Sequence, residues 1–329
     1  MTEIRVDPLT GLRAIIAGER SERPGSGLEP PPADPSFDPE LDPFLEGHED
    51  RTPPELDALR ADGSAPDTPG WQVRVVPNLY PALDPQAAAP PREARADLFA
   101  TAAARGGHEV IVSTPRAVST LSALGAGELE QAMTMWRRRI AHHVSHGAAC
   151  VHLFVNDGRA AGASQPHSHA QLVALDFVPA RVARERERFG AYATSTMGGN
   201  LLADLVQEEV RLDQRVVAVG DDAVVLAPYA SGTPYQLMVV PRRPAMRFED
   251  EGPLCAAALG DALARLERRF GRPPALNLWV RTAPRGAEHY CWHIDVRPRL
   301  GTPAGLELGT GVDVNPVAPE RAARELRDA

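Results

Sequence analysis

The sequence contains no lysine, because all 35 of its basic residues are arginine. No lysine Schiff base can form, and a side-chain cation that binds phosphate has to be arginine, whose planar fork matches phosphate geometry. Cysteine is also scarce, and Cys150, Cys255 and Cys291 form no CxxC motif. Their spacing argues against a disulfide scaffold or a cysteine-rich zinc module and predicts a cytoplasmic protein.

Long apolar runs are missing as well. None reaches 18 residues, which excludes a membrane-spanning helix, and the first residues lack the charged-then-apolar profile of a signal peptide. The formal net charge of −9 argues against a general nucleic-acid binder. With 43% hydrophobic and 24% charged residues, a chain of 329 residues is typical of a soluble globular protein of about two domains.

The same order of elements occurs twice along the chain. Alternating β-branched residues predict strands, and apolar residues at helical spacing predict helices. The first copy has predicted strands at 71–76 and 109–114, a helix at 128–144 and strands at 151–155 and 169–175; the second has a strand at 235–241, a helix at 254–270 and strands at 276–280 and 292–296. A duplication explains this repeat. The sequence therefore predicts an α+β protein with two similar sheets.

Two other segments differ in composition from these copies. Residues 24–70 are rich in proline, glycine and aspartate, which predicts irregular chain laid over a surface. Residues 181–190 are rich in arginine and glutamate and lie between the copies, where they predict a solvated helix face.

The most informative segment places His167, His169 and Gln171 at alternate positions of one predicted strand. Alternate side chains of a strand point to the same face, so these three share a face. Gly158, Gly162 and Ser164 lie just upstream, where backbone N–H groups can approach an anion. The pattern is short, and ordinary strand histidines beside a glutamine are the alternative interpretation.

This arrangement suits attack on a phosphoryl group. A neutral imidazole can attack the α-phosphate of a nucleotide and become a nucleotidyl-histidine, provided its other nitrogen stays protonated. A glutamine amide on the same face can donate to the phosphoryl oxygen where charge builds up.

Further motifs extend over nearly the whole chain. They are DPLTG (Asp7–Gly11), GERSERP (Gly18–Pro24), PFLEGHEDRTPPEL (Pro43–Leu56), VRVVPNLYPAL (Val73–Leu83), GHEVIVSTP (Gly107–Pro115), APYASGTPYQLMVVPRRP (Ala227–Pro244), WHIDVRPRL (Trp292–Leu300) and TPAGLELGTGVDVNPVAPERAARELR (Thr302–Arg327). Together with HxHxQ they resemble the galactose-1-phosphate uridylyltransferase family, in the transferase branch of the histidine-triad superfamily. The resemblance implies two tandem histidine-triad-like repeats, each an antiparallel sheet with packed helices, and a homodimer. Residues 1–177 would hold the active site and the Pro-rich segment, and residues 178–329 a degenerate repeat with contacts on the sugar-phosphate side.

The resemblance also implies roles for individual residues. His169 aligns with the nucleophile that takes up UMP, and Gln171 with the glutamine that stabilises the uridylyl-histidine. The implied substrate-binding residues are Arg20 and Arg23 near the nucleotide phosphates, Asn78 at the ribose, Asn156 and Ser164 in the phosphate loop, His167 beside the nucleophile and Glu307 in the sugar-phosphate pocket. A surface ion pair is the alternative for each arginine.

The sequence departs from the family at its structural zinc site. Many members bind zinc through a CxxC, a strand-end histidine and the first histidine of HxHxQ. Here Asp42 and Leu45 replace the two cysteines, Ala117 replaces the strand-end histidine, and only His167 is kept. A structural zinc needs about four ligands, so we expect no zinc and no other cofactor, with His167 hydrogen-bonded inside the loop instead.

The second repeat has lost the complete HxHxQ. Cys291-Trp292-His293 stands where relatives often have His-x-His and some bind a second metal. Cys291 is expected to be a small buried thiol, and His289 and His293 to be hydrogen-bonded structural residues. One active histidine per chain is the expectation.

The sequence is compatible with three functions. The leading one is a UDP-glucose:hexose-1-phosphate uridylyltransferase that works by two successive displacements through uridylyl-His169. The second keeps the chemistry but transfers AMP, as ADP-glucose and diadenosine-tetraphosphate phosphorylases do. The third is a non-catalytic nucleotide-binding protein. The expected partners are a nucleotide sugar and a sugar 1-phosphate, with no nucleic acid and no membrane.

Overall fold

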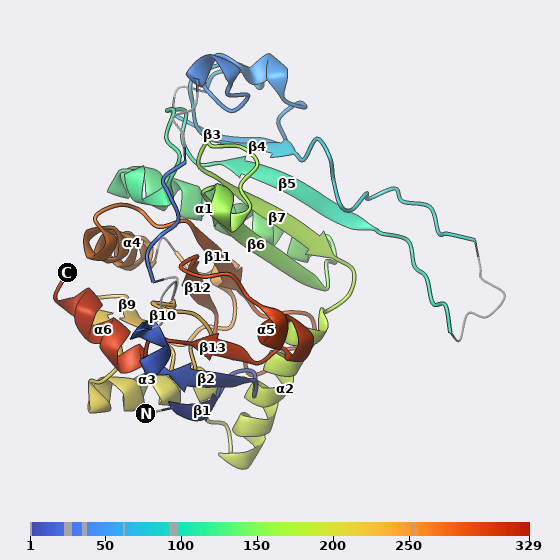
Figure 1. Ribbon diagram of the computed structural model, residues 1–329. Helices are drawn as coiled ribbons and strands as arrows, with labels where there is room; N and C mark the ends of the chain where they lie inside the picture. The colour runs from blue at the N-terminus through green and yellow to red at the C-terminus, as the bar shows by residue number, and fades with distance from the viewer. Residues whose placement is uncertain (1, 23–27, 35–37, 62, 92–97, 253) are drawn as a thin grey trace.

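The computed structural model describes residues 2–22, 28–34, 38–61, 63–91, 98–252 and 254–329 (Figure 1). The strands are β1 (Thr2–Val6), β2 (Arg13–Ala17), β3 (Asp57–Arg60), β4 (Trp71–Pro77), β5 (Gly106–Val112), β6 (Cys150–Asp157), β7 (His169–Leu175), β8 (Val216–Val219), β9 (Ala223–Leu226), β10 (Leu237–Pro241), β11 (Leu276–Arg281), β12 (His293–Pro298) and β13 (Asp313–Asn315). The α-helices are α1 (Ala126–Ser145), α2 (Ala180–Ser195), α3 (Leu201–Leu212), α4 (Ala256–Phe270), α5 (Gly305–Thr310) and α6 (Pro319–Arg327). The predicted α+β class is confirmed, and each strand and helix expected in the two copies is present.

The main sheet crosses both repeats. Its strand order is β3-β4-β5-β7-β6-β11-β12-β10-β9-β8, and all neighbours pair antiparallel. The sequence predicts one sheet per copy. The structure joins these two halves edge to edge, because β6 of the first pairs with β11 of the second. We call this pairing the seam. It buries the edges that two separate sheets would leave open.

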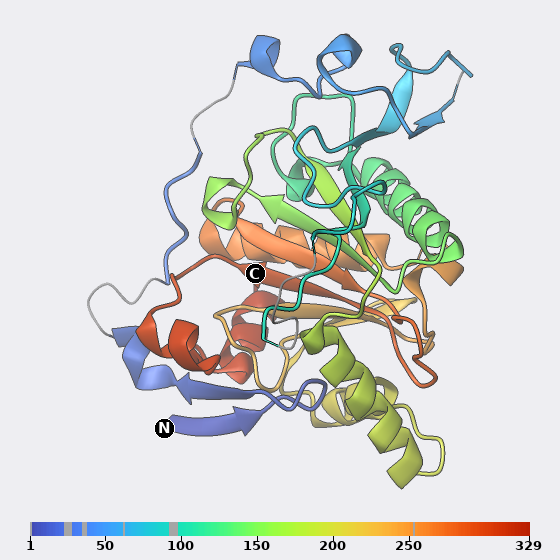
Figure 2. The same ribbon diagram turned by 90° about the vertical axis from the view of Figure 1, so that its right-hand side faces the viewer.

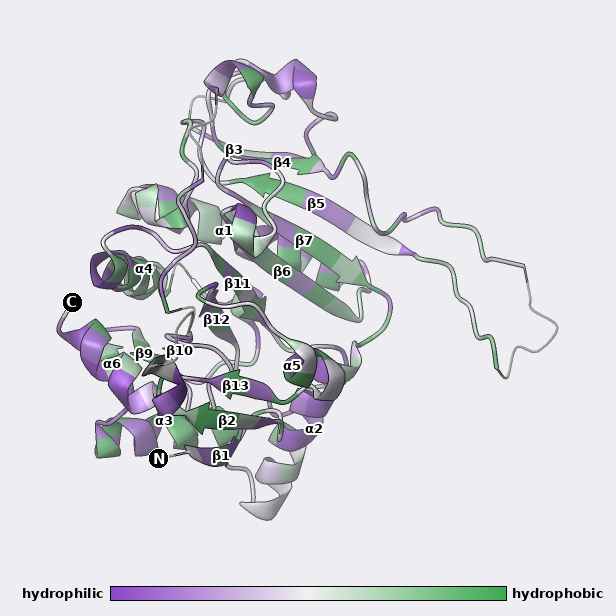
Figure 3. Cartoon of the chain, viewed as in Figure 1, coloured by the Kyte–Doolittle hydropathy of each residue, from purple (hydrophilic) through white to green (hydrophobic). Residues whose placement is uncertain are grey.

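One face of the sheet packs against helices. Leu153 on β6, Leu278 on β11 and Ile294 on β12 are fully buried, and they form one hydrophobic cluster with Trp136 of α1 and Leu266 of α4. The two helices also pack against each other, and Figure 3 shows the apolar colouring of these central strands. The helices therefore close one side of the sheet, and any ligand has to approach the other side.

The opposite face carries a row of polar and aromatic side chains across the seam. Gln171 on β7 pairs with Phe154 on β6, Phe154 pairs with Trp279 on β11, and Trp279 pairs with Asp295 on β12. Directly paired residues point to the same face of a sheet. The polar face thus continues from one repeat into the other.

A small second sheet brings the two ends of the chain together. The hairpin β1–β2 pairs with β13, in the order β1-β2-β13, and Figure 2 shows it below the main sheet. The first residues of the chain therefore lie beside the C-terminal repeat. Among the described residues, no helix has both the length and the apolarity needed to span a bilayer.

The Pro-rich segment 24–70 and the charged segment 181–190 each match their sequence-based prediction only in part. Within residues 24–70, the described parts are mostly irregular, but they include β3, which extends the main sheet and was not predicted. The arginine- and glutamate-rich stretch forms part of α2. Arg184, Glu187 and Arg188 are exposed as expected, whereas Glu185 is buried against the sheet.

Candidate active site

The first residue of β7, His169, has a fixed ring orientation. Its Nδ1 lies 2.7 Å from the His167 carbonyl oxygen. A carbonyl can only accept, so Nδ1 carries the proton and Nε2 keeps its lone pair. Burial lowers the pKa of His169 from its ordinary value, which favours the neutral imidazole. The His169 ring is therefore fixed in orientation, with the neutral form favoured and the lone pair on Nε2.

His108 orients Gln171, although the sequence pattern predicts no role for His108. The Ala82 N–H donates to His108 Nδ1 at 3.0 Å, so the proton of that ring is on Nε2. His108 Nε2 then donates to Gln171 Oε1 at 3.1 Å. Because its oxygen is occupied, the amide of Gln171 has its NH2 group left to donate to a ligand. Asn78 lies on the same side, with its amide nitrogen 3.2 Å from His108 Nε2.

The loop between β6 and β7 provides the anion-binding segment. Gly158 and Gly162 adopt φ values of +85° and +94°, a region that other residues rarely enter. Ser164 is exposed in this loop. Asn156 precedes the loop on β6, and its Oδ1 accepts a hydrogen bond from Asn277 Nδ2 at 2.8 Å. The NH2 group of Asn156 is therefore also available to a ligand.

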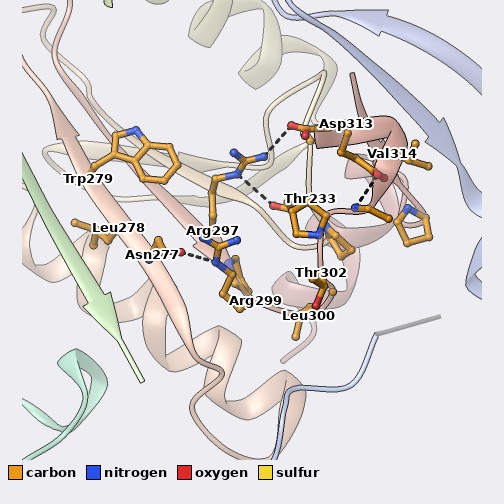
Figure 4. Close-up of a pocket in the computed structure, with 18 of the residues that line it drawn as sticks. Thr233, Asn277, Leu278, Trp279, Arg297, Arg299, Leu300, Thr302, Asp313 and Val314 are labelled. Carbon is orange, nitrogen blue, oxygen red and sulfur yellow. Dashed lines mark hydrogen bonds and ion pairs between the residues drawn. The ribbon is translucent and has the colours of Figure 1, made fainter. Parts of the chain in front are cut away.

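A cavity of about 780 Å³ opens beside this loop, on the polar face of the sheet at the seam (Figure 4). Its lining includes Arg20, Asn156 and Glu307 from the predicted set. His169 and Gln171 are not in the lining, but Phe154, which is paired with Gln171, is. The structure thus brings Arg20, Asn156 and Glu307 to one cavity, one strand away from the nucleophile. Arg23 lies outside the described residues.

His167 occupies the place of the first zinc-ligand histidine. Its Nδ1 lies 2.6 Å from Asp42 Oδ2 and its Nε2 lies 2.8 Å from the Thr114 carbonyl oxygen, and both side chains of the His167–Asp42 pair are fully buried. Both oxygens accept, so both ring nitrogens donate and neither has a lone pair for a metal. Together with Leu45 and Ala117 at two other ligand positions, this pairing does not fit a zinc site.

The Asp42–His167 pair has further contacts that hold it in place. The Phe44 N–H donates to Asp42 Oδ1 at 2.9 Å, and His48 Nδ1 lies 2.6 Å from the Asp42 carbonyl oxygen. The Phe44 ring lies 6.2 Å from that of His167 and 5.4 Å from that of His169. Among the described residues, no group of three or more His, Cys, Asp or Glu side chains could hold a metal ion. Hydrogen bonds and ring packing therefore hold Asp42, Phe44 and His167 together at this place.

The second repeat contains a counterpart of the nucleophile that faces negative charge. His293 Nδ1 lies 3.2 Å from the Cys291 carbonyl oxygen, as in His169, but its Nε2 lies 3.5 Å from Glu185 Oε1 and 3.7 Å from Asp295 Oδ2. Asp295 occupies the position two residues on, which Gln171 has in the first repeat, and a carboxylate there repels phosphate. His293 thus differs from His169 in facing carboxylates on its Nε2 side.

Cys291 and His289 are the other two residues of the second repeat for which the sequence predicts a structural role. Cys291 is buried, and burial raises the pKa of its thiol to about 11, so it is a neutral thiol. His289 is exposed. The expected small buried thiol is thus found.

Comparison with known proteins identifies a family model and several relatives that this chain resembles. The sequence model of "Galactose-1-phosphate uridyl transferase, N-terminal domain" matches residues 1–179. ADP-glucose phosphorylase of Arabidopsis thaliana is 27% identical over 339 residues, which cover 99% of this chain and 92% of the relative. Its crystal structure with bound ADP-glucose has a TM-score of 0.82 at 26% identity, over 100% of this chain and 99% of that one. Galactose-1-phosphate uridylyltransferase of Haemophilus influenzae is 26% identical over 98% of this chain and 93% of its own.

Asp157 lies at the end of β6, just before the β6–β7 loop, and its burial makes the stability of the protein depend on pH. Its Oδ2 accepts from the Leu121 N–H at 2.9 Å, its Oδ1 has no partner among the described residues, and burial raises its pKa from 3.8 to about 7. Between these two pH values the folded state keeps a proton that the unfolded state has lost, so the free energy of unfolding falls as pH rises.

Asp157→Asn is therefore expected to stabilise the protein at pH 8 relative to the wild type, by an amount on the order of 4 kcal/mol, and to have little effect near pH 4. Urea unfolding at a series of pH values measures this difference, with the exposed Asp50→Asn as the control. A difference that does not change with pH would contradict the buried neutral carboxyl.

Proposed function

The chain belongs to the galactose-1-phosphate uridyl transferase family of nucleotidyltransferases, and from this premise we propose that it transfers UMP from UDP-glucose to a hexose 1-phosphate through a covalent intermediate on His169. The observation that carries the proposal is the hydrogen bond from His169 Nδ1 to the His167 carbonyl, which leaves Nε2 as the nucleophile. The neutral state that burial favours makes this nitrogen reactive.

The first displacement forms a nitrogen–phosphorus bond. The Nε2 lone pair attacks the α-phosphorus of UDP-glucose, the bond from phosphorus to the bridging oxygen breaks, and glucose 1-phosphate leaves with the electron pair. In the second displacement, a phosphate oxygen of galactose 1-phosphate attacks the same phosphorus, and the lone pair returns to Nε2. The proton stays on Nδ1, which donates it in a hydrogen bond to the His167 carbonyl throughout, so the imidazolium-like charge of the intermediate is stabilised.

The remaining site residues act on the phosphates. The NH2 groups of Gln171 and Asn156 donate to the phosphoryl oxygens, where charge develops, and Ser164 lies in the loop that receives them. Arg20 and Glu307 line the cavity, where we propose that they contact the leaving group, and Asn78, beside His108, is proposed to contact the ribose. The roles of His167 and Asp42 are to hold the His169 partner carbonyl in position.

A second candidate differs in the nucleotide and the acceptor. ADP-glucose phosphorylase of Arabidopsis thaliana matches this chain over almost its full length in both sequence and structure. The same histidine would then take up AMP from ADP-glucose, with inorganic phosphate as acceptor. A non-catalytic role is disfavoured, because His169 and Gln171 are both oriented for reaction.

Incubation with UDP-glucose, and separately with ADP-glucose, followed by intact-protein mass spectrometry tests the intermediate. We expect an acid-labile gain of one UMP that is absent in His169→Ala and retained in the exposed-residue control His289→Ala, whereas a gain of one AMP supports the second candidate. Gln171→Ala is expected to slow both half-reactions by about 10²- to 10³-fold, as loss of an oxyanion donor does. Normal turnover by His169→Ala would refute the assignment.

We also propose that catalysis needs no metal, which the doubly engaged His167 supports. Chelator treatment is expected to leave turnover unchanged, and the purified protein to contain far less than one zinc per chain by elemental analysis. Stoichiometric zinc that chelation removes together with activity would show the proposal to be wrong.

Asp42→Ala leaves His167 without its buried partner. It is expected to lower the free energy of unfolding by roughly 3–5 kcal/mol, whereas the exposed Asp50→Ala does not.

We further propose a cytoplasmic homodimer. The segment between β4 and β5 exposes Leu79, Tyr80, Leu98 and Phe99, each more than half exposed, and large apolar side chains exposed along one segment favour coverage by a partner. Light scattering is expected to give twice the mass of 35.4 kDa, and Phe99→Asp to shift it toward one chain, with Leu41→Asp as the exposed control. A wild-type monomer would contradict the dimer.

The proposed cytoplasmic location is supported by the buried free thiols, which suit a reducing compartment. Cell fractionation tests this location.

A further inference from the structure

Arg299, which directly follows β12, is a cation without a matching carboxylate. It lines the cavity at the seam, and among the described residues no carboxylate lies within 4.0 Å of its guanidinium. Its neighbour Arg297 differs, because Arg297 Nη2 lies 3.1 Å from Asp313 Oδ2. Figure 4 shows the two arginines side by side at the cavity. The local charge around Arg299 is therefore positive, and an anionic ligand would balance it.

The guanidinium of Arg299 is also fixed in direction. Its Nε donates to Asn277 Oδ1, on the adjacent strand β11. This bond occupies the inner edge of the fork and leaves both terminal nitrogens free among the described residues, which is the arrangement that binds phosphate bidentately. Because the chain contains no lysine, arginine is the only residue type that can supply such a cation.

Asn277 connects Arg299 to the phosphate loop of the other repeat. Its Nδ2 donates at 2.8 Å to Asn156 Oδ1 and at 2.8 Å to the Ala161 carbonyl oxygen. Asn277 and Asn156 are direct partners across the seam. One amide thus holds Asn156, which faces the transferred phosphate, and Arg299, which faces the cavity, in a fixed relation.

The position of this pair indicates which part of a substrate it meets. Asn78 and His108 lie on the β4 and β5 side of Gln171, whereas Asn156, Asn277 and Arg299 lie on the β6, β11 and β12 side. A nucleotide sugar bound with its nucleoside on the first side and its α-phosphate at His169 extends its second phosphate toward the seam.

We propose that Arg299, held by Asn277, binds the phosphate that is not transferred: the phosphate of the departing sugar 1-phosphate and of the incoming acceptor. This inference rests on the proposed function and assigns a ligand, a phosphate monoester dianion or inorganic phosphate, to a part of the site contributed by the second repeat. Arg299 contacts this phosphate directly, and Asn277 is a positioning residue for both Arg299 and Asn156.

Steady-state kinetics and ligand binding of Arg299→Gln test the proposal, with the exposed Arg243→Gln as a matched control. Loss of a charge-assisted hydrogen bond is expected to raise the KM for the acceptor about 10- to 100-fold. The Kd for UMP or AMP alone, measured calorimetrically, is expected to stay within about twofold, because these nucleotides carry only the α-phosphate. Arg299→Lys keeps the charge but loses the fork, so it should recover part of the acceptor affinity.

Two further arms identify the source of the phosphate and the role of Asn277. Glucose 1-phosphate and inorganic phosphate are tested separately as acceptors, and the one whose KM rises more in Arg299→Gln is the ligand of this subsite. The double variant Asn277→Ala/Arg299→Gln is expected to raise the acceptor KM by less than the product of the two single fold-changes. The reason is that each single substitution disrupts the same hydrogen-bonded pair. Arg243→Gln combined with Arg299→Gln is expected to be multiplicative.

The outcomes separate this proposal from the function on which it rests. If wild-type protein forms a nucleotidyl adduct and Arg299→Gln keeps a normal KM for both acceptors, the subsite is refuted while the proposed function stands. An equal loss of affinity for UMP or AMP and for the acceptor would also refute it, because the effect would then be structural. If the wild type forms no adduct with any nucleotide sugar, the proposed function itself fails.

Discussion

The hydrogen bond from His169 Nδ1 to the His167 carbonyl determines which ring nitrogen can react, and the rest of the site depends on it. That carbonyl is held because His167 is bound on both sides, by Asp42 and by the Thr114 carbonyl. Asp42 in turn fixes the loop that brings Phe44 against His169. An ion pair and a few hydrogen bonds therefore fix the position of the His169 ring.

The seam between β6 and β11 has an equal share in building the site. In two separate sheets, Asn156 would end the polar face at an open edge. Pairing with β11 places Asn277 directly beside it and continues the face to Arg299. The second repeat thus contributes residues to the cavity beside the first repeat through a shared sheet.

Much of the fold and of the reacting strand could be predicted from the sequence, because both depend on short periodic patterns. The alternation at His167, His169 and Gln171 places three side chains on one face wherever the strand lies. His108, Asn277 and Arg299 could not be found in this way, since their roles follow from strand register between distant segments. The buried Glu185 was missed for a related reason: a charged stretch gives no sign that one of its residues meets Arg281 and His293. The loss of zinc ligands was readable, but the ion pair that takes their place needed the structure.

The two repeats show how one geometry acquires two uses. Both place an imidazole whose Nδ1 faces the carbonyl two residues before it. In the first repeat the residue two positions on is Gln171, an uncharged donor that tolerates a phosphoryl group. In the second it is Asp295, which together with Glu185 surrounds His293 with carboxylates and with Arg281, so that charge is balanced within the protein. Directly after this strand the balance changes sign, because Arg299 has no carboxylate partner among the described residues. The second copy thus has carboxylates beside its histidine and, next to the seam, an arginine without a carboxylate partner among the described residues.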